Sequence, residues 1–190
     1  MATQAAPETE TPERFDDAPG SWSTGDDGVV VVLDEGEELS VDGEVVRGRS
    51  AFAPDREWVV TGKYVRFDEP RPTTVGASVE GLEHVYDAPG QVEFEIVGPA
   101  LRLTAFPGKN PEDLSVLSTD ATSGVTTYAA NPVVQVPMPA ADGTVVLDFN
   151  RAVNLPCAYT DLATCPLPPA ANRLPIAVEA GEQIPFERRG

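Results

Sequence analysis

The pattern of short β-forming stretches separated by turn-forming pairs is the feature that most limits how this chain can fold. In residues 92–96, Val, Phe and Ile alternate with two glutamates, and this period of two is typical of a strand with one buried face. The pairs Asp42-Gly43 and Asp142-Gly143 each lie between two β-forming stretches, and Asp-Gly is a strong hairpin signal. The sequence therefore predicts a mainly β fold, an antiparallel barrel or sandwich.

We expect about nine or ten strands at this spacing of turn signals. The segments expected to form strands are residues 28–33, 38–41, 44–47, 57–67, 92–96, 101–105, 133–137, 144–149 and 176–178. Helical periodicity is absent elsewhere, except that Asn110-Pro111-Glu112-Asp113 has the N-cap, proline and acidic residues that start a helical turn.

Residues 1–20 differ in composition from the rest of the chain. They are rich in proline and in acidic and small residues, and Phe15 is their only aromatic residue. Such a segment cannot bury enough apolar surface to offset its loss of conformational entropy. We therefore expect a disordered acidic tail at 1–20 and a single β-rich domain at 21–190. The segment also lacks the basic and apolar stretches of a signal peptide, which favours the cytoplasm of a prokaryote.

The net charge restricts the partners that this protein can have. Thirty-one acidic residues stand against thirteen basic ones, a formal net charge of −18, and the acids are concentrated in the N-terminal half. A surface this negative repels phosphate backbones and anionic lipids. We expect no nucleic-acid partner and no membrane partner, and the sequence leaves the oligomeric state open.

Few of the common catalytic patterns can be built from this chain. His84 is the only histidine, and the sequence contains no Gly-x-Ser-x-Gly motif, phosphate-binding loop or dinucleotide fingerprint. We interpret Asp120-Ala-Thr-Ser-Gly124 as a tight turn in which the Asp and Ser side chains bond to nearby backbone, rather than as a protease motif. We expect no cofactor.

The segment from Leu155 to Pro169 is interrupted by prolines and has no periodicity. Its low charge and apolar residues argue against disorder, so we expect an ordered loop that packs across the sheet as a lid. Its cysteines, Cys157 and Cys165, are expected to be free thiols, with a disulfide as the alternative if the protein meets an oxidant. A zinc site would need both cysteines, His84 and a carboxylate at an unusually wide spacing, so we expect no metal.

Several motifs near the C-terminus resemble a known family. They are Asp148-Phe-Asn-Arg-Ala-Val-Asn154, Pro156-Cys-Ala158, Ala163-Thr-Cys-Pro-Leu-Pro-Pro169, Asn172-Arg-Leu-Pro175 and Glu179-Ala-Gly-Glu182, with Asp120-x-Thr-Ser-Gly124 and Thr127-Tyr128 upstream. Together they resemble the family catalogued as domain of unknown function 1684, over roughly residues 56–183. The resemblance implies a bacterial or archaeal protein of uncharacterised activity.

The chain departs from the pattern of that family at four places. Ser118-Thr119 stands where the family usually has Phe-Arg, and Asn131-Pro132 where it has Gly-Arg. Val153 and Leu155 replace the usual tyrosine and proline. If the family binds an anion through those two arginines, this member does not bind it in the same way.

Polar residues cluster in the otherwise apolar C-terminal stretch, and they are the candidate ligand-binding residues: Asp148, Asn150, Arg151, Asn154, Cys157, Tyr159, Asn172, Arg173 and Glu179. One interpretation is a buried polar network in which the two arginines pair with carboxylates and hold the loop. The other is that these residues line a small-molecule pocket beneath residues 155–169.

Three classes of function are consistent with these features. The first is a small-molecule-binding β-domain with its pocket under the 155–169 loop. The second is an enzyme acting on a small, largely apolar metabolite, by acid–base chemistry at Asp148 or Glu179 or by shape-selective rearrangement. The third is an acidic protein-interaction module that meets a basic partner.

Overall fold

The structure is a computed structural model that describes residues 13–15, 18–25, 28–32, 39–41, 44–46, 50–96, 98, 100–130, 132–185 and 188. The chain forms two compact units, Met1–Ser50 and Ala51–Gly190. Strand β1 (Glu13–Phe15) and the start of β2 (Ala18–Gly25) lie within the segment that we expected to be a disordered tail. Residues 1–12 of that segment lie outside the described residues.

Two small antiparallel sheets make up the first unit. One has the strand order β1-β2-β3, with β3 at Gly28–Val32. The other pairs β4 (Leu39–Val41) with β5 (Glu44–Val46), which confirms the hairpin predicted around Asp42-Gly43, although these two residues lie outside the described ones.

The second unit contains one antiparallel sheet with the strand order β11-β6-β7-β8-β9-β10-β12. These strands are β6 (Val59–Gly76), β7 (Glu83–Glu95), β8 (Ala100–Pro107), β9 (Asp113–Leu117), β10 (Pro132–Pro137), β11 (Thr144–Asp148) and β12 (Val153–Asn154). The prediction of a mainly β, antiparallel fold is confirmed. Within the described ranges no pairing joins the two outermost strands, so the sheet is not closed into a barrel.

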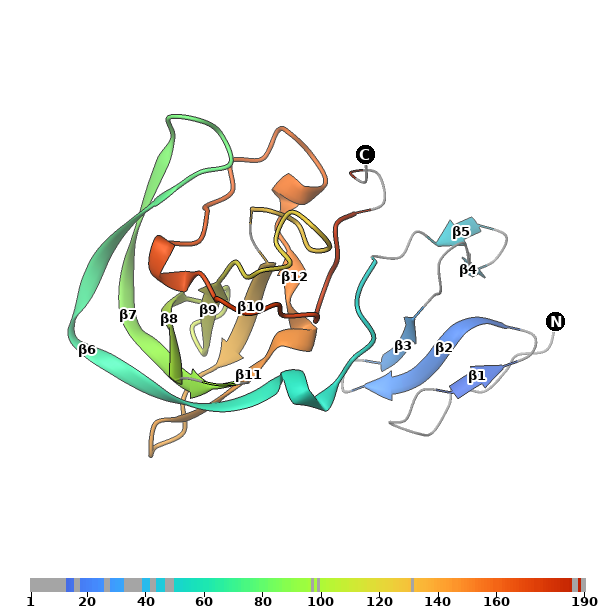
Figure 1. The fold of residues 1–190 in the computed structure, drawn as a ribbon, viewed down its shortest axis with the longest axis horizontal. Coiled ribbons are helices and arrows are strands. Elements are labelled where there is room, and N and C mark those ends of the chain that lie inside the picture. Colours follow the sequence, from blue (N-terminus) through green and yellow to red (C-terminus); the bar gives the residue numbers. More distant parts are fainter. Residues whose placement is uncertain are drawn as a thin grey trace. The chain divides into compact units, whose positions relative to one another are not determined.

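Strands β6 and β7 form a long curved hairpin (Figure 1). Arg66 pairs with Gly90 but Arg71 pairs with Ala88, so β6 has additional residues that form a bulge, and bulges bend a strand. A Cβ atom on Gly90 would lie 2.5 Å from the Val65 carbonyl oxygen, so this close approach requires glycine. Beyond the bulge, β6 and β7 pair with each other in the described residues, and Gly76 at the end of β6 also accepts a hydrogen bond from Leu167.

The main core is formed by alternate residues of the sheet strands. Val92, Leu103, Val116, Val136 and Leu147 are fully buried there, and C-terminal residues, including Leu174 and Val178, pack against them. On β7 the glutamates between the apolar residues are exposed, as their alternation predicted.

Three local predictions differ from the structure. Residues 176–178 form no strand, although Val178 is buried and the Ile176 carbonyl accepts a hydrogen bond from Ala121 N. The segment from Asn110 forms a turn and not a helix, because β9 begins at Asp113. The strands on either side of Asp142-Gly143 pair with different neighbours, β10 with β9 and β12, and β11 with β6.

The helices are all short 3-10 turns in the described part of the chain: η1 (Arg56–Trp58), η2 (Phe149–Arg151), η3 (Pro156–Ala158) and η4 (Ala170–Asn172). None of them is long and apolar enough to cross a membrane. Three of them, η2, η3 and η4, lie in the irregular C-terminal segment that packs against the sheet.

Two adjacent residues of β11 test the position of the core. Leu147 is fully buried and Val146 is 45% exposed on the opposite face. We expect Leu147→Ala to lower the free energy of unfolding by about 2–5 kcal/mol, because it leaves a cavity. The control Val146→Ala should cost under about 1 kcal/mol. Denaturant unfolding measures both, and equal losses would show that the core lies elsewhere.

Candidate functional site

A cavity of about 330 Å³ lies between the outer half of the β6–β7 hairpin and strands β8 to β10. This volume is within the range of small-molecule sites. Most of its lining is apolar, and the lining residues are Val75, Tyr86, Phe106, Pro107, Gly108, Lys109, Ser115, Leu117, Val133, Gln135, Leu155, Pro166 and Leu167.

Strands β9 and β10 are covered on both faces. One face packs in the main core, and the cavity lies on the other face. On β9, Leu114 and Val116 point into the main core, whereas Leu117 lies on the other face and lines the cavity. On β10, Val134 and Val136 likewise face the core, and Val133 lines the cavity. The cavity side carries a second, smaller buried cluster, formed by Ala88, Phe106, Leu117 and Val133.

The proline-rich loop 155–169 forms one wall of the cavity through Leu155, Pro166 and Leu167. Hydrogen bonds tie this loop to the turn that joins β6 to β7. Ser78 Oγ donates to the Ala163 carbonyl oxygen (2.9 Å) and accepts from Cys165 N (3.0 Å), and Leu167 N donates to the Gly76 carbonyl oxygen (2.7 Å). The loop is therefore held against the outer end of the hairpin.

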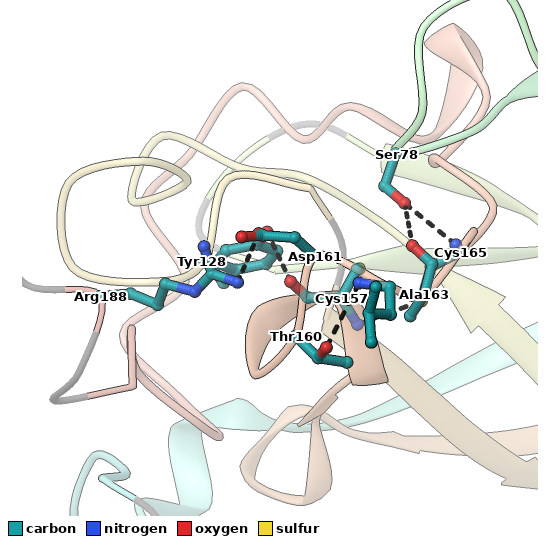
Figure 2. A network of polar contacts seen from close by, with 9 residues as sticks. Ser78, Tyr128, Cys157, Thr160, Asp161, Ala163, Cys165 and Arg188 are labelled. Atoms are coloured by element: carbon teal, nitrogen blue, oxygen red, sulfur yellow. Dashed lines mark hydrogen bonds and ion pairs between the residues drawn. The ribbon is translucent and has the colours of Figure 1, made fainter.

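A second anchor holds the start of the loop. Figure 2 shows Tyr128 and Ser78 on either side of the two cysteines. The Tyr128 hydroxyl donates to the Cys157 carbonyl oxygen (2.9 Å), and burial raises the pKa of Tyr128, so the hydroxyl remains a donor. At the loop surface, Asp161 pairs with Arg188 at 2.7 Å.

Cys157 and Cys165 are both free and buried. Cys157 N donates to Cys165 Sγ at 3.3 Å. Burial, followed by the hydrogen bond with Cys165, raises the pKa of the Cys157 thiol to about 12. A thiol with this pKa stays protonated near neutral pH, which argues against a nucleophilic or metal-binding role for Cys157.

The candidate residues at the start of the C-terminal stretch bind to the protein's own backbone. Asp148 caps η2 by accepting hydrogen bonds from Asn150 N (3.1 Å) and Asn150 Nδ2 (3.0 Å). The Asn150 amide also exchanges two hydrogen bonds of 2.9 Å with the backbone of Asp55. These hydrogen bonds hold the backbone of Asp55, just before η1, against η2.

Asn154 and Tyr159 both contact the carboxylate of Glu182, which is buried. Its Oε2 accepts from Asn154 N at 2.6 Å and from the Tyr159 hydroxyl at 3.0 Å. The Asn154 side chain also donates to the Gln183 carbonyl oxygen at 2.8 Å. Glu182 thus links the beginning of the loop to the C-terminal segment.

Asn172 is fully buried and joins strands β8 and β9 where their pairing ends. Its Oδ1 accepts from Thr104 N (2.7 Å), and its Nδ2 donates to the carbonyl oxygens of Thr104 (2.8 Å) and Leu117 (2.7 Å). The side-chain amide therefore takes the place of a neighbouring strand, which explains a buried amide at this position.

The two candidate arginines differ from the interpretation in which they are buried and paired with carboxylates. Arg151 and Arg173 are both exposed, as is Glu179, and Arg173 forms no ion pair within the described residues. None of the nine candidate residues lines the cavity. Their role in ligand binding stays a prediction. Most of the hydrogen bonds described above for these residues go to backbone groups of the protein.

The interpretation of residues 120–124 as a hydrogen-bonded turn is confirmed. Asp120 Oδ1 accepts from Thr122 N and Thr122 Oγ1, both at 2.6 Å, and Ser123 Oγ accepts from Asp120 N, so this motif is a hydrogen-bonded turn. His84 lies on β7, and its Nε2 bonds to the Thr164 carbonyl oxygen at 2.9 Å. No group of three or more potential metal ligands occurs in the part of the chain that the structure describes.

The model of the family described as protein of unknown function DUF1684 matches residues 46–183. The chain belongs to this family. A DUF1684 match of this length includes the whole cavity lining and all the candidate residues. No curated protein matches the chain.

A solved structure is also similar to this DUF1684 protein. It is the solution NMR structure of an uncharacterized protein from Haloarcula marismortui, at 29% sequence identity and a TM-score of 0.61. The similarity covers 75% of this chain and 79% of the other.

The bridging role of Asn172 can be tested against its neighbour. Asn172→Ala leaves buried backbone groups of Thr104 and Leu117 without their partner, so we expect a loss of about 2–4 kcal/mol in the free energy of unfolding. Arg173→Ala changes an exposed side chain and should cost about 0.5 kcal/mol or less. If Arg173→Ala costs as much as Asn172→Ala, the description of a buried amide and an exposed arginine is wrong.

The thiols give a second test. At pH 8 the raised pKa keeps Cys157 protonated and burial limits access to both sulfurs. We expect little reaction of the native protein with a disulfide reagent, and two reacting thiols per chain after denaturation. Fast reaction of the native protein would contradict the buried, protonated state, and no thiol after denaturation would show a disulfide.

Proposed function

We propose that this protein binds a small, largely apolar molecule in the cavity beside the loop 155–169. The observation that carries this proposal is an apolar cavity of about 330 Å³ whose walls come from strands and a loop far apart in the sequence. The cavity is open to solvent on one side, where Pro107 and Lys109 are exposed, and small-molecule sites are typically concave with mostly apolar walls. A cavity of this size with apolar walls is therefore better explained by a ligand than by packing alone.

In this proposal the loop 155–169 acts as an ordered lid over the cavity. The hydrogen bonds from Ser78 and Tyr128 would hold the lid in place without occupying the cavity. Leu155 lines the cavity, and Val153 packs beside it against the smaller cluster. Since tyrosine and proline are usual at these two positions in the family pattern, Val153 removes a phenol hydroxyl and Leu155 places a larger apolar side chain in the lining.

The lining favours binding over acid–base catalysis. In the described part of the chain, its ionisable side chains are Tyr86 and Lys109, and no carboxylate, histidine or cysteine is among them. Asp148 and Glu179, the acids considered for catalysis, lie outside it. An enzyme that rearranges its substrate by shape alone is the alternative that this lining still supports. A cytoplasmic location is part of this proposal, and it is supported by two buried cysteines that are not joined in a disulfide.

Two leucines of the same loop provide a test and its matched control. Leu155 lines the cavity, whereas Leu162 is 93% exposed. We expect the parent to bind 1-octanol, an uncharged apolar probe, in calorimetric titration. Leu155→Trp should weaken this binding at least about tenfold because the indole occupies the cavity, and Leu162→Trp should bind like the parent.

Two outcomes would contradict the proposal. One is that the parent binds no apolar probe. The other is that Leu155→Trp, folded by circular dichroism, binds 1-octanol as tightly as Leu162→Trp does.

A further inference from the structure

We infer that the cavity selects an apolar ligand with one anionic head group, in chemical class a medium-chain carboxylate, and that Lys109 is the residue that selects it. This inference rests on the proposed function, because it assigns the ligand class of the same cavity. It adds a charge preference that the apolar walls alone would not give.

Lys109 is the only charged residue in the described lining of the cavity. The chain has 31 acidic residues, and Lys109 is one of its two lysines. The other, Lys63, donates a hydrogen bond to the Asp142 carbonyl oxygen. Lys109 forms no ion pair or hydrogen bond within the described residues, so its ammonium group is available to a ligand.

The turn that carries Lys109 is fixed by its own contacts. Gly108 N donates to the Asp113 carbonyl oxygen (2.9 Å), and a Cβ atom on Gly108 would lie 2.7 Å from Asp113. The Asp113 carboxylate accepts from Asn110 Nδ2 at 2.9 Å. The acid that ends the turn is thus bonded to an amide and not to Lys109, and the backbone at Lys109 is held at the rim of the cavity.

Apolar walls with one cationic side chain favour an amphiphile, a molecule with an apolar tail and a charged head group. Lys109 is exposed, so its ammonium group would attract an anion about as strongly as a surface ion pair does, which is enough for a modest preference. Tyr86 also lines the cavity, and its hydroxyl has no hydrogen-bond partner in the described part of the chain, so this proposal makes it a second donor to the head group. The tail of the ligand would then lie against Leu117, Val133 and Leu155.

The volume limits the length of the tail. A cavity of about 330 Å³ is at the lower end of the volumes of small-molecule sites, so it suits a short-chain or medium-chain ligand rather than a long-chain one. A carboxylate with a chain of about eight carbons is such a ligand. Octanoate is therefore the appropriate anionic probe, and 1-octanol and octyltrimethylammonium have the same chain with a neutral and a cationic head.

The experiment compares these three probes by calorimetric titration of the full chain at pH 8 and low salt. We expect the parent to bind octanoate about five- to tenfold more tightly than 1-octanol, and octyltrimethylammonium most weakly. Lys109→Gln should remove the preference for octanoate and leave the affinity for 1-octanol unchanged. Lys63→Gln, the same change at the other lysine, should keep the preference.

The outcomes separate this inference from the proposed function. If 1-octanol binds but octanoate binds no more tightly, or if Lys109→Gln keeps the preference, the selection by Lys109 is wrong and the cavity proposal stands. Equal loss of the preference in Lys63→Gln would also overturn it, because net charge alone would then explain the result. If none of the three probes binds the parent, the proposed function itself fails.

Discussion

Strands β9 and β10 carry apolar side chains on both faces, and the rest of the second unit is arranged to cover both. Their core faces pack against β7, β8 and the C-terminal segment. Their opposite faces cannot be left to water, and they are covered by the bent outer half of the β6–β7 hairpin and by the loop 155–169. The hairpin and the loop are bonded to each other through Ser78 and Leu167. The cavity is the space that remains between this cover and the two strands.

The sequence predicted strands either from alternating side chains, as at residues 92–96, or from runs of β-branched residues, as at 133–137. Residues 92–96 alternate between apolar and acidic side chains, and they form a strand with one buried and one exposed face. Strand β9 was missed because Leu114, Val116 and Leu117 together show no alternation when both faces are covered. The segment 176–178 resembles a strand in composition, but it is buried by packing and has no ladder partner in the described structure. Its conformation depends on tertiary contacts that a local pattern does not contain.

The sequence indicated the loop that forms one wall of the cavity, but not the other residues that line it. The loop 155–169 is ordered by hydrogen bonds and lines a cavity, but the polar motif residues around it, such as Asp148 and Asn172, bond to the backbone. The cavity lining consists of ordinary apolar residues that come together only because the β6–β7 hairpin bends. The sequence did contain one feature related to the inferred head-group contact. Lys109 is one of only two lysines in a very acidic chain.

The most direct test of the account is a titration of methyl-labelled protein with octanoate, followed by NMR. The account predicts that the methyl resonances of Leu117, Val133 and Leu155 shift with one common saturation curve. Those of Leu103 and Leu147, which are fully buried in the main core, should remain in place. Shifts that are spread evenly over the protein, or that fall on the core methyls while the three cavity methyls do not move, would contradict it.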